Sequence, residues 1–243
     1  MVTKVRQIHG LRAYPTVSTD EASRLAHLVW FATGCALGFL IPYIFTSVLD
    51  LSHDLYYLIY FGTVLVFLAA YTRATGADVI QFFRTSWRWS LAIGLLSTLF
   101  VIVNVVSRNS TDGPSGLYAV FEVMWRGLAY GTVDALLLSA FPGLVAFGLI
   151  GRDLSNLRRH CAFFAAALPL VVVITATYHL GYEQYREDGI IAPEIGNTVI
   201  SVPMLTTGNP LGSLITHASM HATADIHSYE TDVFLPPMTE SPD

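Results

Sequence analysis

Two sets of ionisable residues stand at helical spacing inside otherwise apolar stretches of this 243-residue chain. In the first set, Glu122, Arg126, Tyr130 and Asp134 follow one another at intervals of four residues. Residues four apart lie on one face of an α-helix, so these side chains form one stripe in which Glu122 and Arg126 can make an ion pair. Such a stripe is typical of polar side chains that hold neighbouring helices together. Alternatively, it contains a carboxylate that the arginine holds in place for catalysis or transport.

The second set is His217, His221 and Asp225, again four residues apart. Two histidines one turn apart on a helix can bind one metal ion, as in H-E-x-x-H enzymes, although here no glutamate stands between them. The same side chains also suit hydrogen bonds between helices. His179 is isolated near the end of another apolar stretch, and a lone histidine in such a place is more often structural.

The composition makes these ionisable residues informative. Only 13% of the residues are charged, against about 25% in an ordinary soluble domain, and 53% are hydrophobic. This deficit indicates an integral membrane protein. With 13 basic against 18 acidic residues, the chain cannot build the basic face of a nucleic-acid binder. An ionisable group at the centre of a bilayer costs about 2.5–3.5 kcal/mol, so any group found there needs a partner or a function.

The apolar residues gather in stretches of the length that a membrane-spanning helix needs, about 20 residues. Five are continuous or nearly so: 27–49, 55–71, 89–106, 117–150 and 161–182. A sixth region, 195–226, is broken at Pro203 and at Gly208-Asn209-Pro210, so it is either a re-entrant piece plus one helix from Leu211 or two short helices. The sequence therefore predicts an all-α, polytopic membrane protein with about six transmembrane helices, or seven to eight if short ones are counted.

Loop charges predict the orientation. Ten of the 13 basic residues precede the first stretch or lie between the second and third or the fourth and fifth: Lys4, Arg6, Arg12, Arg24, Arg73, Arg84, Arg88, Arg152, Arg158 and Arg159. Basic loops stay in the cytoplasm, so we expect a multi-pass protein of the cell membrane with a cytoplasmic N-terminus. Residues 73–88 are expected to form a surface helix on that side. The expected organisation is a polar N-terminal segment (1–26), a membrane domain (27–227) and an acidic flexible tail (228–243).

This orientation predicts one composite site in the outer half of the membrane. A helix that begins outside at about Leu211 places His217 roughly 9 Å and His221 roughly 15 Å below its start, at 1.5 Å per residue. Three further residues near the outer ends of their spans are expected in the layer of His217: Glu122, Arg126 and His179. Asp134 and Asp225 are expected deeper.

Hydrolysis is the chemistry that such a set of residues favours. Glu122 could act as general base on water, with Arg126 keeping it ionised and fixed. His179, His217 and His221 could orient that water, stabilise an oxyanion, or bind zinc or another divalent metal. A serine nucleophile is disfavoured because the G-x-S-x-G elbow is absent.

These residues resemble the motifs of the CPBP intramembrane proteases, the family of CAAX prenyl endopeptidases and of bacteriocin-processing and abortive-infection proteins. Glu122-Val-Met-Trp-Arg126-Gly127 resembles the E-x-x-x-R-G core of its first motif. His179 resembles the histidine of its second motif, and His217 or His221 that of its third, H-x-x-x-N. The resemblance covers residues 117–227. It implies an intramembrane peptidase that acts, within membrane lipid, on a peptide or lipidated peptide, through a glutamate-activated water and histidines that stabilise an oxyanion or bind metal.

Two other functions fit the same residues. The ladder of His217, His221, Asp225 and Asp134 could serve as a relay in a transporter or channel for a metal ion or a proton. Alternatively, the polar groups only pack helices together in a non-catalytic membrane scaffold.

Overall fold

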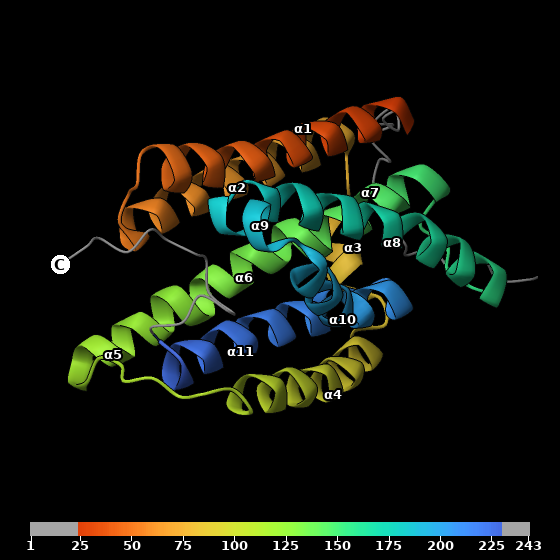
Figure 1. Ribbon diagram of the computed structural model, residues 1–243. Coiled ribbons are helices and arrows are strands. Elements are labelled where there is room, and N and C mark those ends of the chain that lie inside the picture. Colours follow the sequence, from red (N-terminus) through yellow and green to blue (C-terminus); the bar gives the residue numbers. More distant parts are fainter. Residues whose placement is uncertain (1–23, 230–243) are drawn as a thin grey trace, which may run out of the picture.

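The computed structural model describes residues 24–229, and every regular element in that range is helical (Figure 1). The predicted all-α class is therefore confirmed for this part of the chain. Residues 1–23 of the predicted N-terminal segment and 230–243 of the predicted tail lie outside the described residues.

Within residues 24–229, five helices are long and apolar enough to cross a membrane. They are α1 with its π-helical extension η1 (Arg24–Pro42 and Tyr43–Val48), α2 (His53–Thr75), α4 (Trp87–Val106), a continuous run over Gly116–Ile150, and α8 (Leu157–Leu180). Each coincides with one of the five predicted stretches. Continuous apolar stretches predict such helices because a helix that is surrounded by protein or lipid on every side is apolar all round.

The run over Gly116–Ile150 is the central helix. It comprises α5 (Gly116–Glu122), η2 (Val123–Ala129), α6 (Tyr130–Ala135), η3 (Leu136–Ala140) and α7 (Phe141–Ile150). Its apolar window is 78% buried, against 28–39% for the other four spans. Figure 1 shows it crossing the bundle, with α1 and α2 on one side and α11 and α4 on the other. The polar stripe of this helix therefore faces protein rather than lipid.

The broken sixth region forms two helices of 17 residues each, α10 (Ile191–Thr207) and α11 (Leu211–His227). Of the two predicted arrangements, two short helices is the one observed. Gly208 ends α10 in the left-handed conformation, with φ at +66°, which glycine adopts without steric cost.

α11 runs in the direction opposite to the one predicted. The Asn209 amide donates to three carbonyl oxygens in the connection before α4, those of Phe82, Phe83 and Thr85, at 3.1, 2.8 and 2.6 Å. At its far end, His227 Nε2 lies 3.0 Å from the carbonyl oxygen of Arg108. The prediction that Leu211 begins outside was wrong because α10 crosses the bundle first. His221 and Asp225 therefore lie nearer than His217 to the end that contains Arg108, and are not deeper.

The two ends of the bundle differ in charge. We call the end that holds the connections 76–86 and 151–156 the basic end, and the end that holds 107–115 and 181–190 the acidic end. A cavity of about 520 Å³ at the basic end is lined by Arg24, Gly76, Arg152 and Gly208, so the loops predicted to share a side do so. The predicted surface helix over 73–88 is shorter, α3 (Val79–Arg84), because α2 continues to Thr75. A short helix, α9 (Glu183–Asp188), lies at the acidic end.

Small residues let the central helix approach α11 closely. A Cβ placed on Gly131 would lie 2.8 Å from Ala218 Cα, and one on Gly127 would lie 2.7 Å from Ala222 Cα. Two small residues four apart on each helix are typical of tight packing between membrane helices. This contact sets the distance between the two polar stripes.

Candidate metal centre

The two polar stripes predicted from the sequence face each other as an antiparallel ladder. The rungs are Arg126 with Asp225, Tyr130 with His221, and Asp134 with His217. The numbers in each pair have the same sum, 351, because one helix descends as the other rises and both repeat every four residues. The pairing follows from the direction of α11, which the sequence did not reveal.

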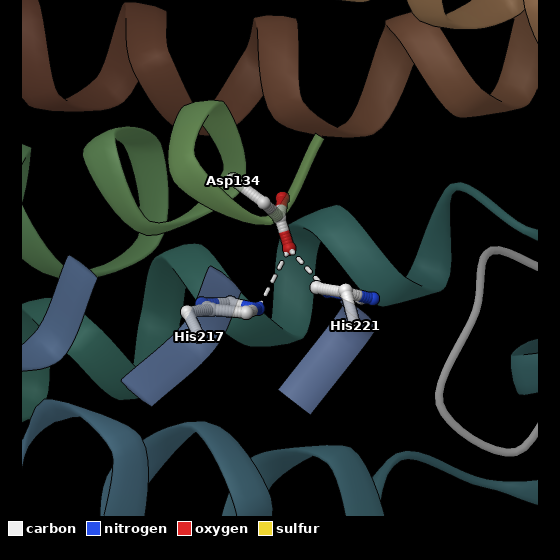
Figure 2. Close-up of side chains that lie close together, drawn as sticks. All are labelled: Asp134, His217 and His221. Atoms are coloured by element: carbon white, nitrogen blue, oxygen red, sulfur yellow. Dashed lines mark ion pairs between the residues drawn. The ribbon is translucent and has the colours of Figure 1, made fainter. Parts of the chain in front are cut away.

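The innermost rung, Asp134 with His217, forms a cluster of three ligand-type side chains together with His221 of the next rung. Asp134 Oδ2 lies 3.1 Å from His217 Nε2 and 3.9 Å from His221 Nε2 (Figure 2). One nitrogen or oxygen atom from each residue lies within 4.8 Å of the others. All three side chains are buried, with 3–4% of each residue exposed. The structure thus joins two of the three predicted metal ligands to Asp134, which was expected deeper than the site and, in the transporter alternative, in one ladder with both histidines.

A tyrosine from α2 holds the Asp134 carboxylate. The Tyr60 hydroxyl donates to Oδ1 at 2.6 Å, and Tyr60 is fully buried. One carboxylate oxygen is thereby occupied, and the other faces the histidines. Sequence spacing gave no sign of Tyr60, because it lies 74 positions before its partner.

A longer set of tyrosine hydroxyls surrounds the centre. Tyr130 contacts Tyr178, Tyr178 lies 2.7 Å from Tyr182, and Tyr182 lies 2.5 Å from Tyr56. At most 2% of each of these residues is exposed. Linked hydrogen bonds between hydroxyl groups strengthen one another in a low-dielectric interior. This row of tyrosines therefore connects α2, α6 and α8 beside the cluster. Of these four tyrosines, the sequence pattern singled out only Tyr130, as part of the polar stripe.

Glu122 and Arg126 belong to a separate charged cluster nearer the acidic end. Arg126 Nη1 lies 3.4 Å from Glu122 Oε2, which confirms the predicted ion pair, and Arg126 Nε lies 3.6 Å from Asp225 Oδ1. The guanidinium also lies over the ring of Tyr229, 4.3 Å from its centroid. Among residues 24–229, no histidine nitrogen lies within 4.0 Å of the Glu122 carboxylate.

The expected single layer of Glu122, Arg126, His179 and His217 is therefore divided. Because α11 runs from the basic end, Asp225 rather than His217 stands opposite Arg126. Arg126 precedes Asp134 by two turns on the same stripe. The catalytic roles of Glu122 and Arg126 stay predictions, and the contacts of both residues are those of a buried ion cluster.

The Asp134 cluster opens onto a cavity of about 550 Å³. This volume lies in the range of ligand pockets, about 300–1,000 Å³. Tyr130, whose ring centroid lies 4.9 Å from that of His221, lines the cavity beside the cluster, whereas Arg108 and Asp188 line it at the acidic end. A ligand in this cavity would reach the open side of the three-residue cluster.

His179 lies on the wall of the same cavity but outside the cluster. Its Nδ1 lies 2.9 Å from the Thr175 carbonyl oxygen. The structure therefore brings His179 near the histidines of α11 without grouping it with them, and its assignment as a metal ligand stays a prediction.

The donor set fits a divalent metal ion. Two imidazole nitrogens and one carboxylate oxygen form the protein ligand set of hydrolytic zinc sites, and also that of the two-histidine, one-carboxylate iron sites. Both kinds of site keep at least one coordination position for water or substrate. The predicted involvement of zinc or another divalent metal therefore has a buried group of residues that could hold it.

Comparisons of the chain with protein-family models, with curated proteins and with solved structures find no match. The resemblance to the CPBP intramembrane proteases thus rests on the motif residues alone. Chemistry at the cluster has to be argued from its geometry.

Proposed function

We propose that this chain is a multi-pass cell-membrane hydrolase with its basic end in the cytoplasm. Asp134, His217 and His221 bind one divalent metal ion, and the substrate is a membrane-borne molecule held in the adjoining cavity. One observation carries the proposal: three buried ligand-type side chains, with donor atoms within 4.8 Å of one another, form part of the wall of a 550 Å³ cavity. A bound metal of this kind supplies an activated water by lowering the pKa of that water to about 7.

In this proposal the residues around the metal ligands have separate positioning roles. Tyr60 keeps the Asp134 carboxylate in one orientation, so that Oδ2 stays on the side of the histidines. Glu122, Arg126 and Asp225 hold the central helix and α11 in register two turns away. The CPBP resemblance favours a peptide substrate and gives Glu122 the role of general base, which is the competing form of the same proposal.

The course of the polar stripe favours catalysis over transport. Towards the basic end, the central helix carries no ionisable side chain after Asp134; Leu138 and Phe141 are 1% and 0% exposed, and its one polar side chain there, Ser139, lies 2.7 Å from Ser201 Oγ. A path for ions or protons requires polar groups through the whole membrane. The ionisable groups of the stripe stop at the Asp134 cluster. This arrangement fits a catalytic site that is reached from one end of the bundle.

The test is metal analysis and turnover of the purified protein. We expect one zinc or cobalt ion per chain, and loss of that ion in the double variant His217→Ala, His221→Ala. His160→Ala, which changes a partly exposed histidine at the basic end, is the matched control and should keep the metal. Cleavage of a peptide library in proteoliposomes should require the metal. Absence of stoichiometric metal, or its retention in the double variant, would overturn the proposal. Metal flux without cleavage would favour the transporter.

A further inference from the structure

The cavity of about 520 Å³ at the basic end is a second space of ligand size, and among the described residues it shares no lining residue with the cavity beside the Asp134 cluster. Its charged side chains are Arg24, at the start of α1, and Asp78 and Arg152, from the connections 76–86 and 151–156. Two arginines against one aspartate leave a net positive charge. This balance favours a ligand with a net negative charge.

A buried histidine forms part of the wall of this cavity. His27 is 6% exposed, and its Nδ1 lies 3.0 Å from the Tyr71 hydroxyl, so Nε2 is the ring nitrogen that remains for a ligand among the described residues. When the Tyr71 hydroxyl donates to Nδ1, the proton of the neutral ring lies on Nε2, and a protonated ring carries one there as well. A Cβ on Gly148 would lie 2.4 Å from three atoms of this ring, so the glycine leaves the space that the ring occupies. His27 is therefore positioned as a hydrogen-bond donor.

Arg152 connects the two loops at this end of the bundle. Its Nη2 donates to the Gly76 carbonyl oxygen at 3.2 Å, and its Nη1 lies 4.0 Å from Asp78 Oδ2. The side chains of this ion pair are 43% and 46% exposed, so their attraction is weak. Asp78 Oδ1 also accepts from the Gln81 backbone nitrogen at 2.9 Å, and this carboxylate therefore keeps a partner without Arg152. An anion can replace Asp78 beside the guanidinium at little cost.

We propose that this cavity binds a phosphate group, with Arg24 and Arg152 supplying positive charge and His27 a hydrogen bond. The planar fork of a guanidinium group matches two oxygens of a phosphate, which makes arginine the usual residue for this task. The phosphate could belong to the headgroup of an anionic lipid or to a free phosphate ion. Because the cavity lies where α1 begins and α2 and α7 end, it is at the depth of lipid headgroups. Basic pockets between transmembrane helices on the cytoplasmic side bind such headgroups.

Calorimetric titration of the purified full chain in a neutral detergent tests the inference. The probes are dioctanoylphosphatidylglycerol, which is anionic, dioctanoylphosphatidylcholine, which is zwitterionic, and sodium phosphate. We expect the anionic lipid to bind the parent chain at least about tenfold more tightly than the zwitterionic one. Arg152→Gln should weaken this binding by about tenfold, because a charge-assisted hydrogen bond is lost. Binding of sodium phosphate that Arg152→Gln abolishes, with no preference between the lipids, would support the site and identify a free phosphate as its ligand.

Arg88→Gln is the matched control, because it removes the same charge near the same end of the bundle. Arg88 lies over the Trp87 ring, 5.4 Å from its centroid, and does not line the cavity. This variant should bind the anionic lipid as the parent does. Should Arg152→Gln fail to fold, Arg24→Gln changes an exposed side chain of the same wall and should likewise weaken binding.

Two results would overturn the inference. One is the absence of both a preference for the anionic lipid and binding of sodium phosphate. The other is an equal loss of binding in Arg88→Gln and in the cavity variants, which would mean that the surface charge of the basic end, rather than the cavity, attracts the anion. The double variant His217→Ala, His221→Ala should bind the lipid as the parent does, so this result is independent of the metal analysis.

Discussion

The Tyr60 hydroxyl donates to Asp134 Oδ1 at 2.6 Å, and this bond connects α2 to the central helix at the candidate metal centre. Oδ2 of the same carboxylate lies 3.1 Å from His217 Nε2. Hydrogen bonds of this kind orient metal ligands, and their removal typically costs about 10- to 100-fold in metal affinity. The position of a single hydroxyl group thus bears on the chemistry proposed for the whole site.

Tyr60→Phe should weaken cobalt binding by about 10- to 100-fold while the protein stays folded. The physical reason is that Asp134 loses the donor that fixes its rotamer. Competition with a chelator, followed by visible absorption, measures the affinity. Tyr71→Phe is the control, since Tyr71 is also fully buried on α2 but bonds to His27. Equal cobalt affinity in the two variants would mean that Tyr60 only fills space.

Gly131→Ala should destabilise the fold by about 1–3 kcal/mol, the usual cost of overpacking. The added methyl group would meet Ala218 Cα at 2.8 Å and His221 Cδ2 at 3.0 Å, so the central helix and α11 must separate. Thermal unfolding in detergent measures the loss. Gly62→Ala, on α2, has nothing within 4 Å of its new Cβ and should keep or slightly raise the melting temperature, because alanine favours the helix over glycine. An unchanged melting temperature for Gly131→Ala would contradict the close approach.

Arg126→Leu should destabilise by about 3–5 kcal/mol, because it leaves Glu122 and Asp225 as buried carboxylates without their cation. Unfolding by denaturant provides the measurement. Arg159→Ala breaks an ion pair whose side chains are 49% and 56% exposed, so the expected loss there is at most about 1 kcal/mol. If the two arginine variants are equally stable, the buried cluster does not hold the helices.

Glu122→Gln separates the structural role of Glu122 from a catalytic one. If Glu122 only balances Arg126, this variant should keep metal affinity and turnover within about threefold of the parent and lose stability, since an ion pair in a buried site is replaced by a weaker hydrogen bond. Metal titration, a cleavage assay and an unfolding curve on the same preparation make the comparison. Loss of turnover with unchanged stability would restore Glu122 as the general base, as the motif resemblance implies.

Asn209→Ala should loosen the junction between α10 and α11. The Asn209 side chain is fully buried and donates to three carbonyl oxygens in the connection 76–86, while its Oδ1 accepts from the Leu211 amide at 2.9 Å. Each unpaired carbonyl costs about 1–3 kcal/mol where water cannot replace the donor. Limited proteolysis of the 76–86 connection should become faster in this variant. Asn104→Ala, at the other end of the bundle, should leave the cleavage rate unchanged.

The sequence by itself determined the features that depend on local chemistry. Continuous apolar stretches predicted five helices that the structure contains, because the bilayer demands about 20 apolar residues in a row. The four-residue spacing predicted both polar stripes and the Glu122–Arg126 ion pair. Gly208-Asn209-Pro210 predicted the break in the last apolar region.

Only the tertiary structure decided which residues of the two stripes meet. α10 crosses the bundle before α11 begins, and this reversal places Asp225 opposite Arg126 and Asp134 opposite His217. Tyr60 entered the site for a similar reason, since its contact with Asp134 reaches the cluster from α2. Spacing along a helix fixes which side chains share a face. The partner of each face depends on the direction of the neighbouring helix and on the packing of small residues between them, which no local pattern records.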